Sequence, residues 1–347
     1  MTQERAMKPI SVVIVSYEGR KHLERILNSL VRQHYAGMEV VISDDCSEDT
    51  CDDIVDSFRD RLKIIRTSTK THSGHPSDTR QAGLEAARGD WITFADQDDA
   101  FYPGAISQVT AFIRKNPEAN VIRTEFDEVD PETEKPFRHH AKVYGWTHGT
   151  FIRREWMEKN HIHYKAGMKS HEDIYLSTLI VCAIQAEGGQ EYYCPVNTYR
   201  WYAWNSSLSH KEDRLFIENH LGEYIEATGD AYIENYERRG EPAKEFSRYH
   251  AVSVVLYCYF YHMGCVFRNL SDIIKENSVY ISEYIKKVKE VFGMTNDELL
   301  IYCARDRGTY FWKTMELAEV ATGPYIPYLT LEQYLSLMAW EGADDLE

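Results

Sequence analysis

Short apolar runs alternate with amphipathic stretches along the first half of the chain. Apolar residues recur three and four positions apart in Leu23–Val31, which predicts a helix. The runs that read as buried strands are 10–16, 39–43, 62–66 and 91–95. Strands that alternate with helices indicate βαβ units, so the pattern predicts an α/β fold with a mostly parallel sheet.

The pattern beyond these runs predicts a second region. Further expected elements are helices over 79–87, 103–113 and 174–187, strands over 121–124 and 192–202, a strand or turn over 145–152, and loops over 67–77 and 127–136. From about residue 216 the pattern is helical, with apolar faces at Val252, Val255 and Leu256 and at Tyr280, Tyr284, Ile285 and Val288, and a last helix over 331–340. We therefore expect an α/β domain over 1–215 and a helical domain over 216–347 that shapes an acceptor site or an oligomer interface.

Acidic residues follow two of the predicted strands. Asp44 and Asp45 come after one, and Asp96, Asp98 and Asp99 come after the run 91–95. Because the carboxyl ends of parallel strands meet at one edge, both groups should share the rim where α/β sheets bind ligands. Carboxylates at this density suit Mg²⁺ or Mn²⁺ shared with substrate phosphates. An acidic turn that caps the next helix is the alternative interpretation.

Composition narrows the function classes. The chain has 347 residues and a net charge of −16, which argues against binding to a nucleic-acid backbone. Seven cysteines occur without a Cys-x-x-Cys pair, which favours free thiols in a reducing compartment. The first nine residues lack a signal-peptide core, and the stretch 249–267 reads as a buried helix rather than a membrane span. These features predict a cytoplasmic protein without a transmembrane segment.

A series of motifs resembles the family 2 glycosyltransferases, which have the GT-A fold. The motifs are Val13–Tyr17, Ser43–Ser47, Arg80–Gly83, Asp96–Asp99 with Pro103, and Glu172–Asp173, in the order of the family. The resemblance covers roughly residues 8–210. Two positions depart from the family pattern, since Glu18 stands where Asn is usual and Cys46 where Gly is usual.

The resemblance implies an inverting hexosyltransferase. It would move a sugar from a nucleotide-diphosphate donor, with uridine as the expected base, to a hydroxyl of a saccharide or cell-envelope polysaccharide acceptor. Mn²⁺ or Mg²⁺ would be the cofactor, because a divalent cation stabilises the charge that develops on a leaving diphosphate. A nucleotidyltransferase and a non-catalytic sugar-binding protein on the same fold are the alternatives. The first of these would need a glycine-rich phosphate loop, and the turn after residue 16 lacks it. Peripheral membrane association and oligomerisation are left open.

The resemblance also implies roles for individual residues. Asp173 corresponds to the general base and Glu172 to its neighbour. The expected donor-site residues are Val15, Tyr17, Asp45, Arg80, Asp96 and Asp98, and the expected metal ligands are Asp99, Asp98 and His210. Trp146, His148, Arg200 and Trp201 are candidates for the acceptor side, with core aromatics or solvated charges as the alternative interpretation.

Overall fold

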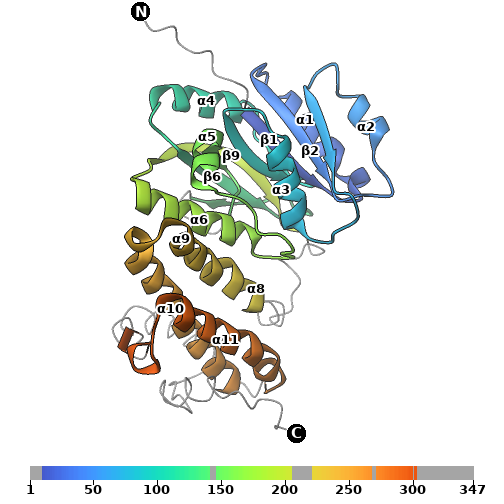
Figure 1. Ribbon diagram of the computed structural model, residues 1–347. Helices are drawn as coiled ribbons and strands as arrows, with labels where there is room; N and C mark the ends of the chain where they lie inside the picture. The colour runs from blue at the N-terminus through green and yellow to red at the C-terminus, as the bar shows by residue number, and fades with distance from the viewer. Residues whose placement is uncertain (1–9, 141–145, 205–220, 268–270, 300, 303–347) are drawn as a thin grey trace, which may run out of the picture. The chain divides into compact units, whose positions relative to one another are not determined.

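The computed structural model describes residues 10–140, 146–204, 221–267, 271–299 and 301–302 of the chain. It divides into two compact units, Met1–Glu212 and Asp213–Glu347. The first unit contains a sheet with helices packed on it, and the described part of the second is helical (Figure 1). His210 and the predicted helix 331–340 lie outside the described residues.

One sheet forms the centre of the first unit. Its strands are β1 (Ile10–Ser16), β2 (Met38–Asp44), β3 (Ile64–Ser68), β4 (Trp91–Asp96), β5 (Ala100–Phe101), β6 (Val121–Val129), β7 (Pro136–His139), β8 (Thr150–Arg153) and β9 (Glu191–Tyr202). Their order is β3-β2-β1-β4-β8-β6-β9-β5, with β7 paired to β6. The first four of these neighbours are parallel, whereas β8 runs antiparallel to both β4 and β6. The predicted α/β architecture is confirmed, and the sheet is mixed beyond β4.

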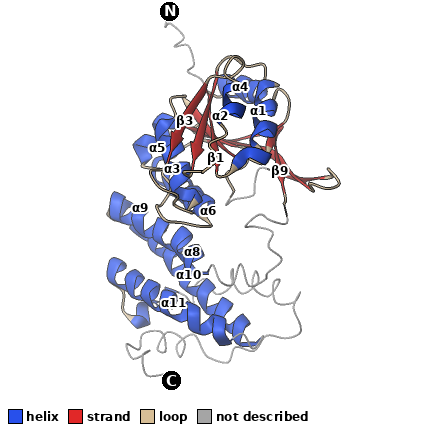
Figure 2. Cartoon of the chain, turned by 90° about the vertical axis from the view of Figure 1, so that its right-hand side faces the viewer, coloured by secondary structure: helices blue, strands red, loops and turns tan. Residues whose placement is uncertain are grey.

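Helices cover both faces of β1, which is why the middle of that strand, Val12–Val15, is apolar on both faces. Val12 on one face belongs to the apolar cluster that α1 (Leu23–Val31) closes. Val13 on the other face meets α3 (Pro76–Ala86) at Gly83, where an added Cβ would lie 2.4 Å from Val13 Cγ1. Only glycine lets the helix approach this closely. In Figure 2 the strands form one layer between the helices.

The remaining helices of this unit agree with the sequence pattern in part. They are a 3₁₀ turn (Gly19–Lys21), α2 (Asp52–Asp56), α4 (Ala105–Lys115), α5 (Arg154–Asn160) and α6 (Glu172–Glu187). The helix predicted from Pro103 begins later, at Ala105, because Gly104 precedes it with a φ of 72°.

The predicted loop over 127–136 is wrong at both ends. β6 continues to Val129, β7 begins at Pro136, and these two residues are paired in register. Asp127 lies directly opposite Arg138 in this hairpin and accepts a hydrogen bond from its guanidinium. Opposite charges facing each other across two strands stabilise the pair. Charged residues here therefore belong to strands rather than to a loop.

Helices pack around a second apolar cluster in the described part of the other unit. They are α8 (Leu221–Ile225), a π-helical turn (Glu226–Asp230), α9 (Ala231–Arg239), α10 (Glu241–Phe267) and α11 (Ser271–Phe292). Val252, Val255 and Leu256 are buried as predicted, but Tyr280 is 53% exposed, so its assignment to the apolar face is wrong. Tyr284 is buried, and its hydroxyl donates to the carbonyl of Ala251 at 2.9 Å. Within the described residues, no helix combines the length and apolarity needed to cross a membrane.

Candidate active site

The carboxyl ends of β1, β2 and β4 meet at one edge of the sheet. Val15 of β1 lies in register with Asp96 of β4, and Ser16 lies in register with Asp44 of β2. β1 lies between its two parallel neighbours, so the strand order reverses here, and open α/β sheets bind ligands at such a point. The strand register therefore places both acidic groups at one edge of the sheet, as expected.

Asp45 is a buried carboxylate held by the loop after β3. The backbone N–H groups of Ser73 and Gly74 donate to it at 3.0 and 2.9 Å, and the Thr69 hydroxyl donates at 2.9 Å. Burial opposes ionisation, but these donors hold the pKa of Asp45 below its ordinary value. Asp45 is therefore a fixed anion, and its N–H donates to the carbonyl of Ser16, the residue before Tyr17, at 2.9 Å.

Gln97 ties Tyr17 to the acidic turn. The Tyr17 N–H donates to Gln97 Oε1 at 3.1 Å, and the Gln97 amide donates back to the Tyr17 carbonyl at 2.9 Å. The Ser16 hydroxyl donates to the same Gln97 oxygen at 2.9 Å. The residues that follow β1 and β4 are thus linked directly.

Tyr199 of β9 joins two of the carboxylates in the acidic turn. Its hydroxyl donates to Asp99 Oδ2 at 2.6 Å and accepts from the Asp96 N–H at 2.9 Å. The Tyr202 N–H donates to Asp99 Oδ1 at 2.8 Å. Asp99 is completely buried, whereas the side chain of Asp96 is 31% exposed. The turn after β4 is therefore fixed by a strand about a hundred residues further along the chain.

The carboxyl groups of this turn are crowded. Burial and then the charge of Asp96 raise the pKa of Asp98 to about 6. Burial and then the charges of Asp98 and Asp96 raise the pKa of Asp99 well above its ordinary value. Burial acts on Asp96 in the same direction, but the Arg80 charge and His148 hold its pKa below the ordinary value. A divalent cation beside the turn would favour the ionised form of each group.

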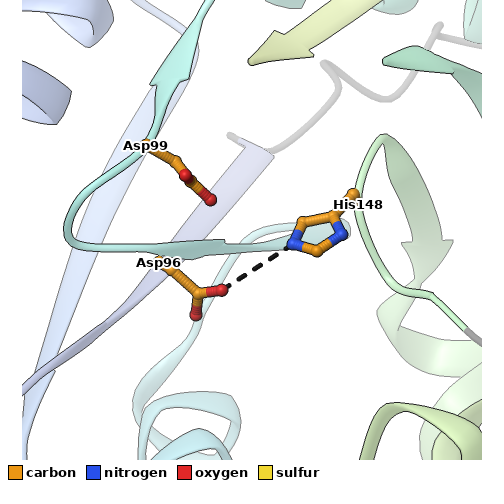
Figure 3. A group of neighbouring side chains, drawn as sticks. All are labelled: Asp96, Asp99 and His148. Atoms are coloured by element: carbon orange, nitrogen blue, oxygen red, sulfur yellow. Dashed lines mark ion pairs between the residues drawn. The ribbon is translucent and has the colours of Figure 1, made fainter. Parts of the chain in front are cut away.

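His148 brings an imidazole to these carboxylates. It precedes β8, the neighbour of β4, and its Nε2 lies 3.7 Å from Asp96 Oδ2 (Figure 3). Its ring is held by stacking on Tyr199, with centroids 5.3 Å apart, and on Trp201, with centroids 5.5 Å apart. Among the described residues, Asp96, Asp99 and His148 form the group that could hold a metal ion, with one ligand atom of each within 4.8 Å of the others.

The donor set of this group fits a divalent cation. Carboxylate oxygens suit Mg²⁺ and Mn²⁺, and an imidazole nitrogen suits transition metals, so of the two expected ions the set suits Mn²⁺ better. The Nδ1 atom of His148 is buried without a hydrogen-bond partner in the described part of the chain. The sequence predicts His148 on the acceptor side, and the structure places its imidazole beside Asp96. Asp98 is outside the group, so its metal role stays a prediction.

Arg80 connects the acidic turn to the start of α6. Its Nη2 lies 2.8 Å from Asp96 Oδ1, and its Nε lies 3.1 Å from Glu172 Oε1 and 3.8 Å from Asp173 Oδ1. Burial opposes the charge on Arg80, but Asp96, Asp173 and Glu172 raise the pKa of its guanidinium well above the ordinary value. One buried cation therefore faces three carboxylates.

Glu172 and Asp173 are not equivalent within this network. Burial and then the charge of Asp173 raise the pKa of Glu172 to about 7. Asp173 Oδ1 is buried and accepts no hydrogen bond from any described residue. Its Oδ2 lies 3.5 Å from the Thr147 N–H, at the limit of hydrogen bonding. Asp173 therefore has lone pairs available for a proton, as a general base requires.

The acceptor candidates separate into two places. Trp146 and Trp201 lie with His148, and the ring centroids of the two tryptophans are 5.3 Å apart. Arg200 instead donates to Glu134 at 2.6 Å, in the turn between β6 and β7. Both tryptophans contact His148, which itself lies beside Asp96. Arg200 is bonded to Glu134 of the hairpin instead.

Several residues of the site carried no local signal in the sequence. Tyr199 lies within a predicted strand, and nothing in its neighbourhood indicates a bond to Asp99. Gln97 stands between Asp96 and Asp98, and nothing in the sequence indicates its bonds to Tyr17. Tyr164, whose buried hydroxyl has no partner among the described residues, packs edge-on against Phe94 behind Arg80. Each depends on contacts between distant parts of the chain.

Comparison with known proteins identifies the family. The family model described as Glycosyl transferase family 2 matches residues 11–170. This part of the chain belongs to the family 2 glycosyltransferases. The match includes Tyr17, Asp45, Arg80 and the acidic turn, and ends just before Glu172.

Two curated relatives have names that state an activity. The poly(ribitol-phosphate) beta-N-acetylglucosaminyltransferase TarS of Staphylococcus aureus (strain Mu50) is 28% identical over 181 residues, which are 48% of this chain and 31% of TarS. A GalNAc(5)-diNAcBac-PP-undecaprenol beta-1,3-glucosyltransferase of Campylobacter jejuni is 29% identical over 104 residues, 29% of this chain and 33% of that protein. The chain spans about a third of the length of these relatives.

The fold has a solved counterpart. The crystal structure of S. aureus TarS 1–349 in complex with UDP-GlcNAc superimposes with a TM-score of 0.64 at 17% identity, covering 90% of this chain and 92% of that one. At this level of identity the likeness establishes the fold. The family 2 glycosyltransferase domain of this chain has the GT-A fold, followed by a helical region.

Proposed function

We propose that the chain is an inverting, metal-dependent glycosyltransferase that moves a hexosyl group from a uridine diphosphate donor to a hydroxyl of a saccharide or cell-envelope acceptor. The observation that carries the proposal is the position of Arg80. Its guanidinium lies 2.8 Å from Asp96 on the donor side and 3.1 and 3.8 Å from Glu172 and Asp173 on the other. One side chain thus joins a donor-side carboxylate to the candidate base, and so supports their placement in a single active site.

The nucleotide would bind at the ends of β1 and β2. Tyr17 offers an exposed ring for stacking, and Asp45 offers a fixed carboxylate for an imide N–H of uracil. Val15 is half-buried at the end of β1, beside Asp96. Asp96 and Asp98 would then lie near the ribose and diphosphate. Arg80 would orient Asp96 through their ion pair rather than meet the nucleotide base.

The metal site would be formed by Asp96, Asp99 and His148. Mn²⁺ or Mg²⁺ bound there would neutralise the charge that develops on the leaving diphosphate. Tyr199 orients Asp99 through its hydroxyl, and the stacking of His148 on Tyr199 fixes the imidazole. Asp98 and His210 remain proposed further ligands.

Asp173 would act as the general base. One of its oxygens accepts the proton of the acceptor hydroxyl while that hydroxyl oxygen attacks the anomeric carbon on the face opposite the departing UDP. The bond from the anomeric carbon to the diphosphate oxygen breaks with its electron pair on that oxygen, and the configuration inverts. Below its raised pKa of about 7, Glu172 would be mostly protonated and so would leave the negative charge to Asp173.

The acceptor class follows from the relatives. Their names describe transfer to poly(ribitol-phosphate) and to an undecaprenol-linked glycan, and both support a saccharide or cell-envelope acceptor for this chain. Trp146 and Trp201 offer aromatic faces beside the site for a sugar ring, and Arg200 stays a candidate at its margin. We further propose that 1–215 is the catalytic domain, that 216–347 serves the acceptor or an oligomer, and that the reaction takes place in the cytoplasm.

The decisive experiment measures UDP release from a panel of UDP-, GDP- and dTDP-sugars with Mn²⁺, beside thermal shift with each nucleoside diphosphate. We expect UDP with Mn²⁺ to raise the melting temperature, because binding to the folded state alone stabilises by about 2.7 kcal/mol at a hundredfold excess over Kd. A response to GDP or dTDP but not to UDP would contradict the uridine assignment. The same thermal shift with UDP in the presence of EDTA would contradict the proposed metal dependence.

A further inference from the structure

The imidazole of His72 lies against two residues of the proposed nucleotide site. Its ring is stacked on that of Tyr17, with centroids 4.2 Å apart and planes at 17°. Its Nδ1 lies 2.9 Å from Asp45 Oδ2 and 3.2 Å from the Asp45 carbonyl. Both oxygens are acceptors, so Nδ1 carries a proton. His72 therefore presents a planar face to Tyr17 and an N–H to Asp45.

His72 lies beside the Asp45 carboxylate where the other donors leave room. A carboxylate has about four lone-pair positions. Oδ1 accepts from the Thr69 hydroxyl at 2.9 Å and from the Ser73 N–H at 3.0 Å. Oδ2 accepts from the Gly74 N–H at 2.9 Å and pairs with His72 at 2.9 Å. The imidazole therefore stands on the side of Oδ2 where the N–H of a nucleotide base would bind.

His72 also covers the face of Tyr17. A third ring between two aromatic faces needs them about 7 Å apart, at about 3.5 Å of van der Waals contact on each side. The observed centroid distance of 4.2 Å does not admit one. A base that stacks on this face of Tyr17 therefore has to replace the imidazole.

Of the groups around Asp45, the His72 imidazole can leave without unfolding the loop. Ser73 and Gly74 donate through the backbone, and the Thr69 N–H is anchored to the Asp44 carbonyl at 3.0 Å. The His72 side chain is 47% exposed, so it can rotate into solvent. Loss of its bond frees one position on Asp45 and one face of Tyr17 together.

We propose that His72 holds the place of the donor base in the unliganded protein, and that the nucleotide binds by exchange with its imidazole. The imidazole makes the two contacts that the base would make, a stack on Tyr17 and a hydrogen bond to Asp45. The inference rests on the proposed uridine diphosphate donor. Its consequence is that His72 lowers donor affinity and admits only a planar base whose own N–H can restore the bond to Asp45.

The test is calorimetry of UDP with Mn²⁺, and of uridine without metal, on the full chain and its His72→Ala variant. We expect the variant to bind both at least threefold more tightly, because the base no longer displaces a bonded ring. His75→Ala is the matched control, since His75 lies in the same loop and its Nδ1 is 3.4 Å from Asp78 rather than at Asp45. It should leave both values of Kd within twofold.

A second measurement follows the imidazole itself. Stacking on Tyr17 shifts the His72 ring protons, and the Tyr17→Ala variant without ligand gives their unstacked position in NMR spectra. On addition of UDP to the wild-type chain, we expect the His72 signals to move to that position. Signals that stay stacked in the complex would overturn the exchange.

The outcomes separate the two proposals. If the wild-type chain binds UDP and His72→Ala binds it equally or more weakly, the exchange is wrong and the donor assignment stands. If neither the wild-type chain nor His72→Ala binds UDP, both the donor assignment and the exchange are wrong. Tighter binding by His72→Ala together with unstacking in the wild-type complex supports both.

Discussion

Arg80 Nη2 lies 2.8 Å from Asp96 Oδ1, and the arginine side chain is only 7% exposed. The Nε of the same guanidinium lies 3.1 Å from Glu172 Oε1 and 3.8 Å from Asp173 Oδ1. A buried cation that faces several carboxylates cannot be removed without leaving charge unpaired in a poorly solvated place. This pair therefore couples the stability of the first unit to the geometry of its proposed active site.

Replacement of Arg80 by Met should be strongly destabilising. Breaking a buried ion pair by removing one partner costs about 3–5 kcal/mol, because the remaining charge stays buried. Arg20→Met is the matched control, since Arg20 bonds Asp49 and Asp53 at the surface with its side chain 49% exposed, and exposed pairs contribute little. Urea denaturation of both variants checks this. Equal losses would show that burial of the Arg80 network is unimportant.

The pKa of Glu172 predicts a pH dependence of stability. Its folded-state pKa of about 7 lies above the ordinary 4.5, so between these values the folded state holds a proton that the unfolded state has released. The free energy of unfolding contributed by this group therefore falls as pH rises through that window. Glu172→Gln removes the titration and should gain stability relative to the wild-type chain between pH 5 and pH 8, in EDTA. A difference that is constant with pH would contradict the raised pKa.

Local patterns in the sequence determine the strands around β1, and distant contacts determine the site. The prediction of β1, β2 and β4 agrees with the structure to within about two residues, because short β-branched apolar runs favour buried strands. The hairpin of β6 and β7 was missed because Asp127 and Arg138 look like loop residues until they are seen to face each other. Composition alone does not reveal a cross-strand pair.

In the acidic turn, too, the local sequence predicts the residues, and contacts with distant residues determine their environment. The sequence placed carboxylates at the end of β4, but the complete burial of Asp99 depends on Tyr199 and Tyr202 of β9. His148 reaches Asp96 because β8 pairs with β4, a pairing that no local pattern specifies. The Arg80 network likewise requires α3, β4 and α6 to meet. The residue types were predictable, and their partners were not.

His148→Ala should weaken Mn²⁺ binding. Loss of one of the three protein ligands from the proposed group leaves two carboxylates, and we expect affinity to fall by about tenfold or more, as removal of even an outer-shell partner commonly costs 10–100-fold. His139→Ala is the matched control, because His139 lies in the same aromatic cluster and pairs with Glu128 instead. Electron paramagnetic resonance of free Mn²⁺ during titration gives both affinities. Equal affinities in the two variants would remove His148 from the metal site.

Asp173→Asn should keep donor and metal binding and lose sugar transfer. The substitution is nearly isosteric, and Oδ1 of Asp173 accepts no hydrogen bond from the described residues, so the fold should survive. It removes the lone pair that takes the acceptor proton, and loss of a general base typically costs about 10²–10⁴ in rate. Single-turnover product formation beside calorimetry of UDP with Mn²⁺ separates the two effects.

Glu172→Gln is the matched variant for that experiment. Glu172 is the neighbouring carboxyl and is bonded to Arg80 at 3.1 Å. With a pKa of about 7 it is mostly protonated at pH 6, and the protonated form cannot accept a proton. We therefore expect Glu172→Gln to retain most of its transfer rate at pH 6 while Asp173→Asn does not. Transfer by Asp173→Asn within threefold of the wild-type rate, with loss in Glu172→Gln, would exchange the roles of the two carboxyl groups.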